Sequence, residues 1–189
     1  MNPELIIATS AAVIAAFAAA ANIISTVLQQ QHNKNSVLPI LDFPCCCSSH
    51  TMSVKIKNAG TGPMIVRSLE ILKDGKMQNS LRSCFESEDM KYIEPYYSTN
   101  YGFILPDGVF TSNEDFSLLY LTLREGVDIK ELRRDNCFCQ TVTRIVDTFR
   151  KIYIVVEYED VYKTKFTRGL DLSTRFSKHK DLLLTASSN

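Results

Sequence analysis

Cysteine is the residue type of this chain best suited to metal binding or nucleophilic chemistry. The six cysteines are Cys45, Cys46, Cys47, Cys84, Cys137 and Cys139. Adjacent cysteines are poor joint ligands for one tetrahedral zinc ion, and the Cys-x2-Cys spacing of zinc sites does not occur. A zinc site would therefore have to combine Cys45–Cys47, His50, Cys137 and Cys139. We instead expect the cysteines to be small, partly buried apolar residues, with no metal and no cofactor.

The oxidation state of the thiols depends on the compartment. An even number of cysteines suits disulfides in an exported domain, whereas cytoplasmic thiols are kept reduced. In a cytoplasmic domain of a eukaryotic host, Cys45–Cys47 would be a candidate for acylation. A reactive thiol needs a low pKa and a basic neighbour. Arg133 and Arg134 precede Cys137 and give weak support for such a thiol there.

Acid–base groups are present without the partners that catalysis needs. His32, His50 and His179 show no recognisable sequence arrangement of a nucleophile with a paired carboxylate. Glu86, Glu88 and Asp89 are close enough together for acid–base work or cation binding. No histidine or metal-loop spacing accompanies them, so a solvated loop is the favoured interpretation. The sequence predicts no catalytic activity.

The segment that organises the chain is Leu5–Leu28, which contains no charged residue. As a helix it is roughly 36 Å long, which is enough to cross a hydrocarbon core of ~30 Å. A cleaved signal peptide is the alternative, but Met1–Glu4 lacks the basic residue of a signal peptide and the apolar run is too long. We therefore predict a single transmembrane helix at residues 5–28, after a flank at residues 1–4.

Small residues recur along this helix at helical spacing. The main row is Ala8, Ala12, Ala16 and Ala20, and Ala11, Ala15 and Ala19 form a second row. Small residues let membrane helices approach closely, and Asn22 would hydrogen-bond across such a contact. These residues predict association with a second copy or with a partner membrane protein. The alternative is that alanine only fills a weakly hydrophobic anchor.

Basic residues after the helix indicate its orientation. His32 and Lys34 follow the apolar segment, whereas Glu4 precedes it. Positive residues favour the cytoplasmic side, so we expect a cytoplasmic domain at the plasma (inner) membrane. Residues 29–36 are predicted to be a polar linker, residues 37–170 one domain, and residues 171–189 a tail.

Alternation of apolar and polar residues predicts a mainly-β domain. The expected strands are an edge strand in 37–43, Met52–Asn58, Met64–Leu72, a central strand at Phe116–Leu123, Lys151–Tyr158 and Val161–Thr167. In Met52–Asn58, Met52, Val54 and Ile56 should face the core, and Ser53, Lys55 and Lys57 should face water. Asp128 is expected to cap a helix that runs to about Asp135, while Cys137–Arg150 fits either a helix or a strand.

Two short motifs carry a resemblance to a family. They are Asn58, Gly60, Gly62 and Pro63 between two strands, and Tyr158, Asp160 and Tyr162 in a late hairpin. Together with the apolar segment they resemble small bacterial membrane proteins that have one N-terminal span and an immunoglobulin-like β-sandwich with one or two short helices. Met64 replaces the usual alanine and Lys163 the usual glycine. The resemblance implies architecture and no general catalytic role.

Composition limits the remaining functions. The 21 basic and 21 acidic residues give zero net charge, which disfavours nucleic-acid binding. Arg175, Lys178, His179 and Lys180 in the tail could contact anionic lipid, although a terminal helix packed on the domain, or a frayed end, is favoured. The sequence thus predicts a membrane-anchored interaction or sensing module. The alternative is a membrane effector that is gated by a small-molecule signal and oligomerises through its helix.

Overall fold

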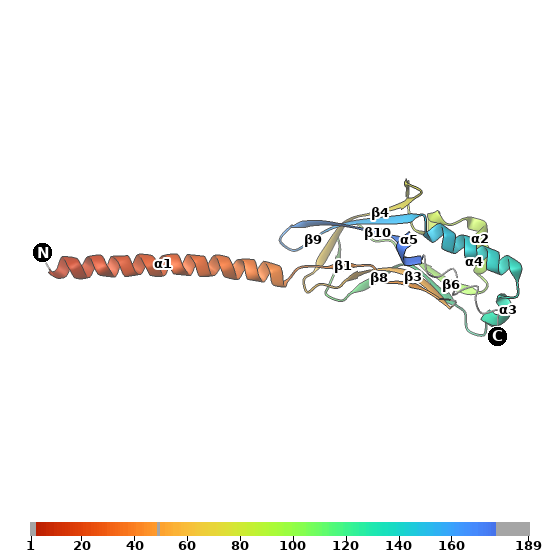
Figure 1. The fold of residues 1–189 in the computed structure, drawn as a ribbon, viewed down its shortest axis with the longest axis horizontal. Helices are drawn as coiled ribbons and strands as arrows, with labels where there is room; N and C mark the ends of the chain where they lie inside the picture. The colour runs from red at the N-terminus through yellow and green to blue at the C-terminus, as the bar shows by residue number, and fades with distance from the viewer. Residues whose placement is uncertain (1–2, 49, 177–189) are drawn as a thin grey trace. The chain divides into compact units, whose positions relative to one another are not determined.

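The structure is a computed structural model that describes residues 3–48 and 50–176 (Figure 1). The chain forms two compact units, Met1–Leu38 and Pro39–Asn189. The first unit contains the helix α1, Pro3–Ser36. The predicted linker 29–36 is therefore helical, because its glutamine and lysine residues favour a helix and it contains neither glycine nor proline. Pro39 explains why the helix ends nearby, since the residue before a proline avoids helical dihedral angles.

The second unit consists of two antiparallel sheets. The first sheet has the order β1-β3-β8-β6, and β2 also pairs with β3. Its strands are β1 (Leu41–Asp42), β2 (Cys45–Cys47), β3 (Thr51–Asn58), β6 (Tyr97–Tyr101) and β8 (Asp115–Leu123). The second sheet has the order β10-β9-β4-β5, and β7 also pairs with β4. Its strands are β4 (Met64–Lys73), β5 (Lys76–Gln78), β7 (Gly108–Phe110), β9 (Ile152–Glu159) and β10 (Lys165–Asp171).

Alternating side chains from both sheets form one core. Val54 and Ile56 of β3 are fully buried in the same cluster as Ile154 and Val156 of β9. The predicted inward face of Met52–Asn58 is confirmed, but the prediction that Ser53 faces water is wrong. Ser53 is buried because Cys46 and Tyr120 flank it on the neighbouring strands.

Strand order confirms two further predictions. β8 lies between β3 and β6, as expected for the central strand Phe116–Leu123, and β1 lies at an edge. The β4–β5 hairpin closes through Asp74 and Gly75, which have φ angles of 49° and 75°. Two consecutive positive φ angles define the type I′ turn that suits the twist of a two-residue hairpin.

Helices cover one end of the sheets. They are the 3-10 turn η1 (Arg82–Cys84), α2 (Ser87–Ile93), α3 (Ile129–Leu132), α4 (Asn136–Phe149) and α5 (Leu172–Phe176). Asp128 caps α3 by accepting a hydrogen bond from the Lys130 amide at 2.8 Å. The predicted continuation to Asp135 is wrong, because Asp135 caps α4 instead. The ambiguous segment 137–150 is helical.

Aromatic stacking ties the last helix to this end. The Phe149 ring stacks on Phe176 with a centroid separation of 4.5 Å and meets the edge of Phe85 at 4.9 Å. The described start of the tail is thus a packed helix, while Lys178, His179 and Lys180 lie outside the described residues. The predicted class, an apolar N-terminal helix before a mainly-β domain, is confirmed; the immunoglobulin-like assignment stays a prediction.

Candidate functional site

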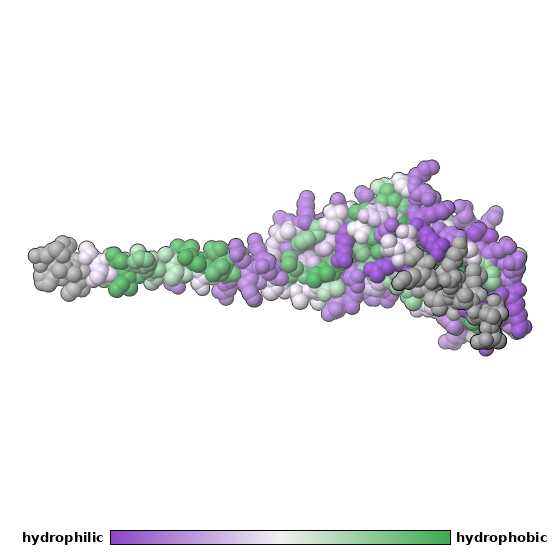
Figure 2. Space-filling view, in the orientation of Figure 1, coloured by the Kyte–Doolittle hydropathy of each residue, from purple (hydrophilic) through white to green (hydrophobic). Residues whose placement is uncertain are grey.

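The apolar surface of α1 is the most prominent functional feature. Large apolar side chains along it are 47% to 73% exposed: Val13, Ile14, Phe17, Ile23, Ile24, Val27 and Leu28. Figure 2 shows them as a green stretch that gives way to polar purple residues in the last turns of α1. In the part of the chain that the structure describes, α1 is the one helix long and apolar enough to cross a membrane, judged by length and composition.

The small residues of α1 lie on adjoining faces. Ala12, Ala16 and Ala20 are exposed and advance slowly around the helix, since four residues exceed one turn by about 40°. Asn22 does not continue this row. It lies seven positions after Ala15, which places it on the second alanine row. The side chain of Ala8 is outside the described residues.

Asn58 holds together the loop that carries the first motif. Its buried side-chain amide donates to the carbonyl oxygens of Gly62 at 2.7 Å and Phe110 at 3.1 Å. Its Oδ1 accepts from the backbone amides of Gly60 at 3.0 Å and Ile40 at 3.3 Å. The motif therefore joins the ends of β1, β3, β4 and β7, with Pro63 leading into β4.

Asp160 organises the second motif in the same way. Its buried carboxylate accepts hydrogen bonds from the amides of Tyr162 and Thr164, both at 2.8 Å. This turn occupies the residues before Lys165, so β10 begins four residues later than the predicted strand Val161–Thr167. Lys163 has a φ of 64°, a left-handed backbone conformation that glycine adopts more readily than other residues. Tyr158 stacks on Phe166 with a centroid separation of 5.3 Å.

A three-residue ion-pair network links the second sheet to the loop before β7. The Arg67 guanidinium donates to Asp107 and to Glu159, of which Glu159 is buried. The hydrogen bond from Arg67 lowers the pKa of the Glu159 carboxyl below its ordinary value. These charges neutralise one another, which is typical of a structural contact.

A polar cleft of about 350 Å³ lies between α2 and α4. Its walls include Glu88, Asp89, Tyr92, Cys137, Gln140 and Arg144. Asp89 is buried and accepts from Arg144 Nε at 2.9 Å, so the prediction that Glu86, Glu88 and Asp89 form a solvated loop is wrong for Asp89. It is also wrong for Glu88, which is exposed but lies in the helix α2. Asp89 faces inward because Ser87–Ile93 is a helix whose buried face it shares with Met90 and Ile93.

Three acid–base groups of this cleft, those of Asp89, Tyr92 and Arg144, are already engaged. Tyr92 donates to Asp135 at 2.7 Å, which raises the pKa of Tyr92 to about 12 and lowers that of Asp135. Arg144 is neutralised by Asp89. The cleft can accommodate a small polar ligand, but within the described residues it contains no histidine and no nucleophile–base pair.

A second cleft is more apolar. It has a volume of about 390 Å³ and is lined by Leu69, Ile71, Leu81, Phe103, Ile104 and Leu105, among others. Phe103 and Leu105 expose about two thirds or more of their surface. This apolar surface lies beside β4, between the segments that pair with β5 and with β7.

All six cysteines are free thiols. Burial raises the pKa of Cys45, Cys47 and Cys84 to about 11, which keeps them protonated near neutral pH. Cys46 and Cys137 are exposed. Over residues 3–48 and 50–176, no three histidine, cysteine or acidic side chains gather as a metal site would require. His32 lies on α1, His50 is exposed before β3, and His179 lies outside the described residues.

The side-chain pairs that sequence reasoning missed join distant positions. Arg144 and Asp89 are 55 positions apart, and Arg67 and Glu159 are 92 apart. Only the buried faces of the helices and strands bring them together. Asn58 and Asp160, by contrast, each belong to a short sequence motif that indicated a turn.

Comparison with known proteins adds little to this geometry. No protein-family model matches the chain, and no curated protein matches it. Among solved structures, the chain shows a likeness to the archaellum periplasmic stator protein FlaG from Sulfolobus acidocaldarius, with 10% identity and a TM-score of 0.22. The match covers 70% of this chain and all of that one. A TM-score this low carries no argument about fold or function.

Proposed function

We propose that the chain is a single-pass membrane-anchored interaction module with no catalytic activity of its own. The observation that carries this proposal is the exposed apolar surface of α1 over its described residues. Water would solvate such a surface poorly, whereas a bilayer buries it. The domain offers clefts and an exposed apolar surface beside β4 for contacts with a partner.

Membrane extraction tests the anchor. Three lysines placed inside the apolar segment should prevent stable insertion, because each costs about 2.5–3.5 kcal/mol at the centre of a membrane helix. The variant combines Ile14→Lys, Phe17→Lys and Ile24→Lys. Its control carries the same added charge in the polar part of α1, as Gln29→Lys, Gln30→Lys and Gln31→Lys.

The wild-type chain and the control should stay in the membrane pellet after alkaline washing. The triple-lysine variant in the apolar segment should leave it. Release of the wild-type chain, or retention of that variant at the wild-type level, would contradict the proposal.

We infer that the domain lies on the cytoplasmic side of the plasma (inner) membrane. The support is Lys34 in the last turn of α1, beyond the apolar segment. Cytoplasmic thiols stay reduced, which agrees with the six free cysteines having no disulfide function.

A second candidate function is that of a ligand-gated effector that oligomerises through α1. The polar cleft between α2 and α4 favours it, because its volume suits a small polar signal. The alanine rows supply a surface for close helix contact. A small-molecule signal and a second copy of the chain would then be its partners, in addition to the lipid bilayer.

A further inference from the structure

Several segments that are far apart in sequence meet at the end of the domain where Ile40 lies. The backbone of Ile40 pairs with Ala59 at 2.7 Å, and Asn58 bonds to the loop before β8. The strand β4 begins after the short loop 59–63 that follows β3, and its second residue, Ile65, pairs with Glu159 at the end of β9. The turn between β9 and β10 therefore belongs to this same end, which we call the Ile40 end.

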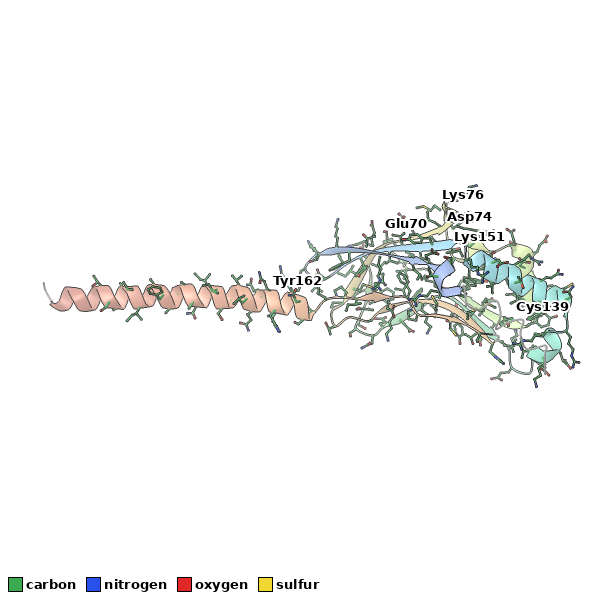
Figure 3. All side chains as sticks on the ribbon, in the orientation of Figure 1. Glu70, Asp74, Lys76, Cys139, Lys151 and Tyr162 are labelled. Carbon is green, nitrogen blue, oxygen red and sulfur yellow. The ribbon has the colours of Figure 1, made fainter. Side chains whose placement is uncertain are left out.

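The Ile40 end exposes apolar and aromatic side chains. Ile40 is 51% exposed, and Val161 and Tyr162 at the tip of the β9–β10 turn are 50% and 45% exposed. Figure 3 shows Tyr162 at one end of the second sheet, with Asp74, Lys76 and Lys151 at the opposite end. A combined apolar and phenolic surface suits the boundary between lipid and water, where tyrosine is enriched.

The charge exposed by this turn is positive. Lys163 and Lys165 are exposed, and among the described residues no ion pair includes either of them. The two acidic residues of the turn point inward: Glu159 is 5% exposed and binds Arg67, and Asp160 is 2% exposed and binds the turn amides.

Three further acidic residues near this end are also engaged. Asp107 pairs with Arg67, Asp115 pairs with Lys55, and Glu114 accepts from Thr111. The turn thus exposes lysines beside apolar side chains, while its own two carboxylates are buried. An anionic lipid surface is the complement of this pattern.

We propose that the β9–β10 turn, with Val161, Tyr162, Lys163 and Lys165, rests on the head groups of the bilayer in which α1 is anchored. This inference depends on the proposed membrane anchor. The sequence keeps the Ile40 end close, because the polar residues 29–36 add a helical rise of only roughly 12 Å beyond the apolar segment. The head-group layer itself extends roughly 5–7 Å on each side of the hydrocarbon.

Tryptophan fluorescence can locate the turn, because the chain contains no tryptophan. Tyr162→Trp places the probe at the tip, and Tyr153→Trp is the matched control on the same hairpin. Tyr153 is 44% exposed and pairs with Leu72 and Asp171, away from the tip. The full-length variants are reconstituted into vesicles of phosphatidylcholine and phosphatidylglycerol that contain a lipid with a spin label on its head group.

The head-group label should quench Tyr162→Trp at least about twofold more strongly than Tyr153→Trp. Lys163→Glu and Lys165→Glu should remove most of this difference, whereas Lys76→Glu and Lys151→Glu at the opposite end should preserve it. Equal quenching of the two tryptophans would overturn the proposal. So would a difference in quenching that stays the same when the turn lysines are replaced and when phosphatidylglycerol is left out. Equal quenching is also the result expected if a protein partner, and not lipid, is what the turn binds.

Flotation of the same vesicles separates this inference from the proposed function. If the chain does not float with lipid, the membrane anchor fails, and the contact of the turn fails with it. If the chain floats but the two tryptophans are quenched equally, the anchor stands and only the contact of the turn is wrong.

Discussion

At the scale of single residues, Asn58 shows how one buried amide can hold several strand ends. Asn58→Ala would leave the Gly62 and Phe110 carbonyls and the Gly60 and Ile40 amides without their side-chain partner. We expect a loss of about 2–4 kcal/mol in the free energy of unfolding, because unsatisfied buried polar groups cost more than the bonds contribute.

Urea unfolding of the detergent-solubilised chain, followed by near-ultraviolet circular dichroism, measures this loss. The control is Asn79→Ala, which removes an exposed asparagine and should change the free energy of unfolding by no more than about 0.5 kcal/mol. Similar midpoints for the two variants would show that Asn58 does not hold the loop.

Glu159 gives the fold a dependence on pH. Its hydrogen bond from Arg67 lowers its pKa from an ordinary value of 4.5, so the folded state favours the ionised form. The resulting stabilisation is present above pH 4.5 and is lost as the pH falls through the lower, folded-state pKa. Glu159→Gln should therefore destabilise the domain near neutral pH, with a difference from wild type that shrinks in acid.

Thermal unfolding across this range of pH measures the effect. Glu70→Gln removes an exposed carboxylate of the neighbouring strand and should follow the wild-type profile. A Glu159→Gln profile parallel to wild type down to the most acidic point would show that the Arg67 contact contributes no pH dependence.

At the scale of elements, α1 is the place to test helix association. Ala12→Leu adds bulk to the face that both alanine rows share and should weaken self-association by roughly 1–2 kcal/mol. Ala21→Leu makes the same change nine positions later, which is two and a half turns away and on the opposite face. Both variants stay apolar, so both should remain anchored.

Cross-linking yield at increasing dilution in detergent measures the association. We expect a lower dimer fraction for Ala12→Leu and a wild-type fraction for Ala21→Leu. Equal dimer fractions for the wild type and both variants would favour the alternative that alanine only fills a weakly hydrophobic anchor.

The elements that could be predicted from sequence are those with a local pattern. Alternation identified β3 and β9, and Asp74-Gly75 identified a hairpin, because these signals lie within a few residues. The sequence left the segment 137–150 ambiguous, because its many β-branched residues favour a strand whereas the spacing of its apolar residues favours a helix. In the structure the cap at Asp135 and the burial of one face stabilise the helix α4.

The candidate sites were harder to predict. The cleft between α2 and α4 depends on Asp89 meeting Arg144, and neither residue carries a signal of the other in sequence. Asp89 belongs to an acidic run whose outward residues Glu86 and Glu88 resemble a solvated loop. Only the packing of α2 on α4 distinguishes the inward carboxylate.

At the scale of the whole molecule, the main prediction concerns the side of the membrane on which the domain lies. Cys46 of β2 and Cys137 of α4 are exposed native thiols, whereas Cys47 and Cys84 are buried. A maleimide that cannot cross membranes should therefore reach Cys46 and Cys137 wherever the domain is accessible to it. The Cys46→Ser/Cys137→Ser double variant identifies labelling that comes from other thiols.

In intact bacterial cells that express the chain, we expect the reagent to leave both thiols unmodified and to label them once the cells are permeabilised. The physical reason is the basic residue that follows the apolar segment, which favours retention of that end in the cytoplasm. Labelling of wild type but not of the double variant in intact cells would place the domain outside. The free thiols would then lie in an oxidising compartment, and the search for partners would move to the cell envelope.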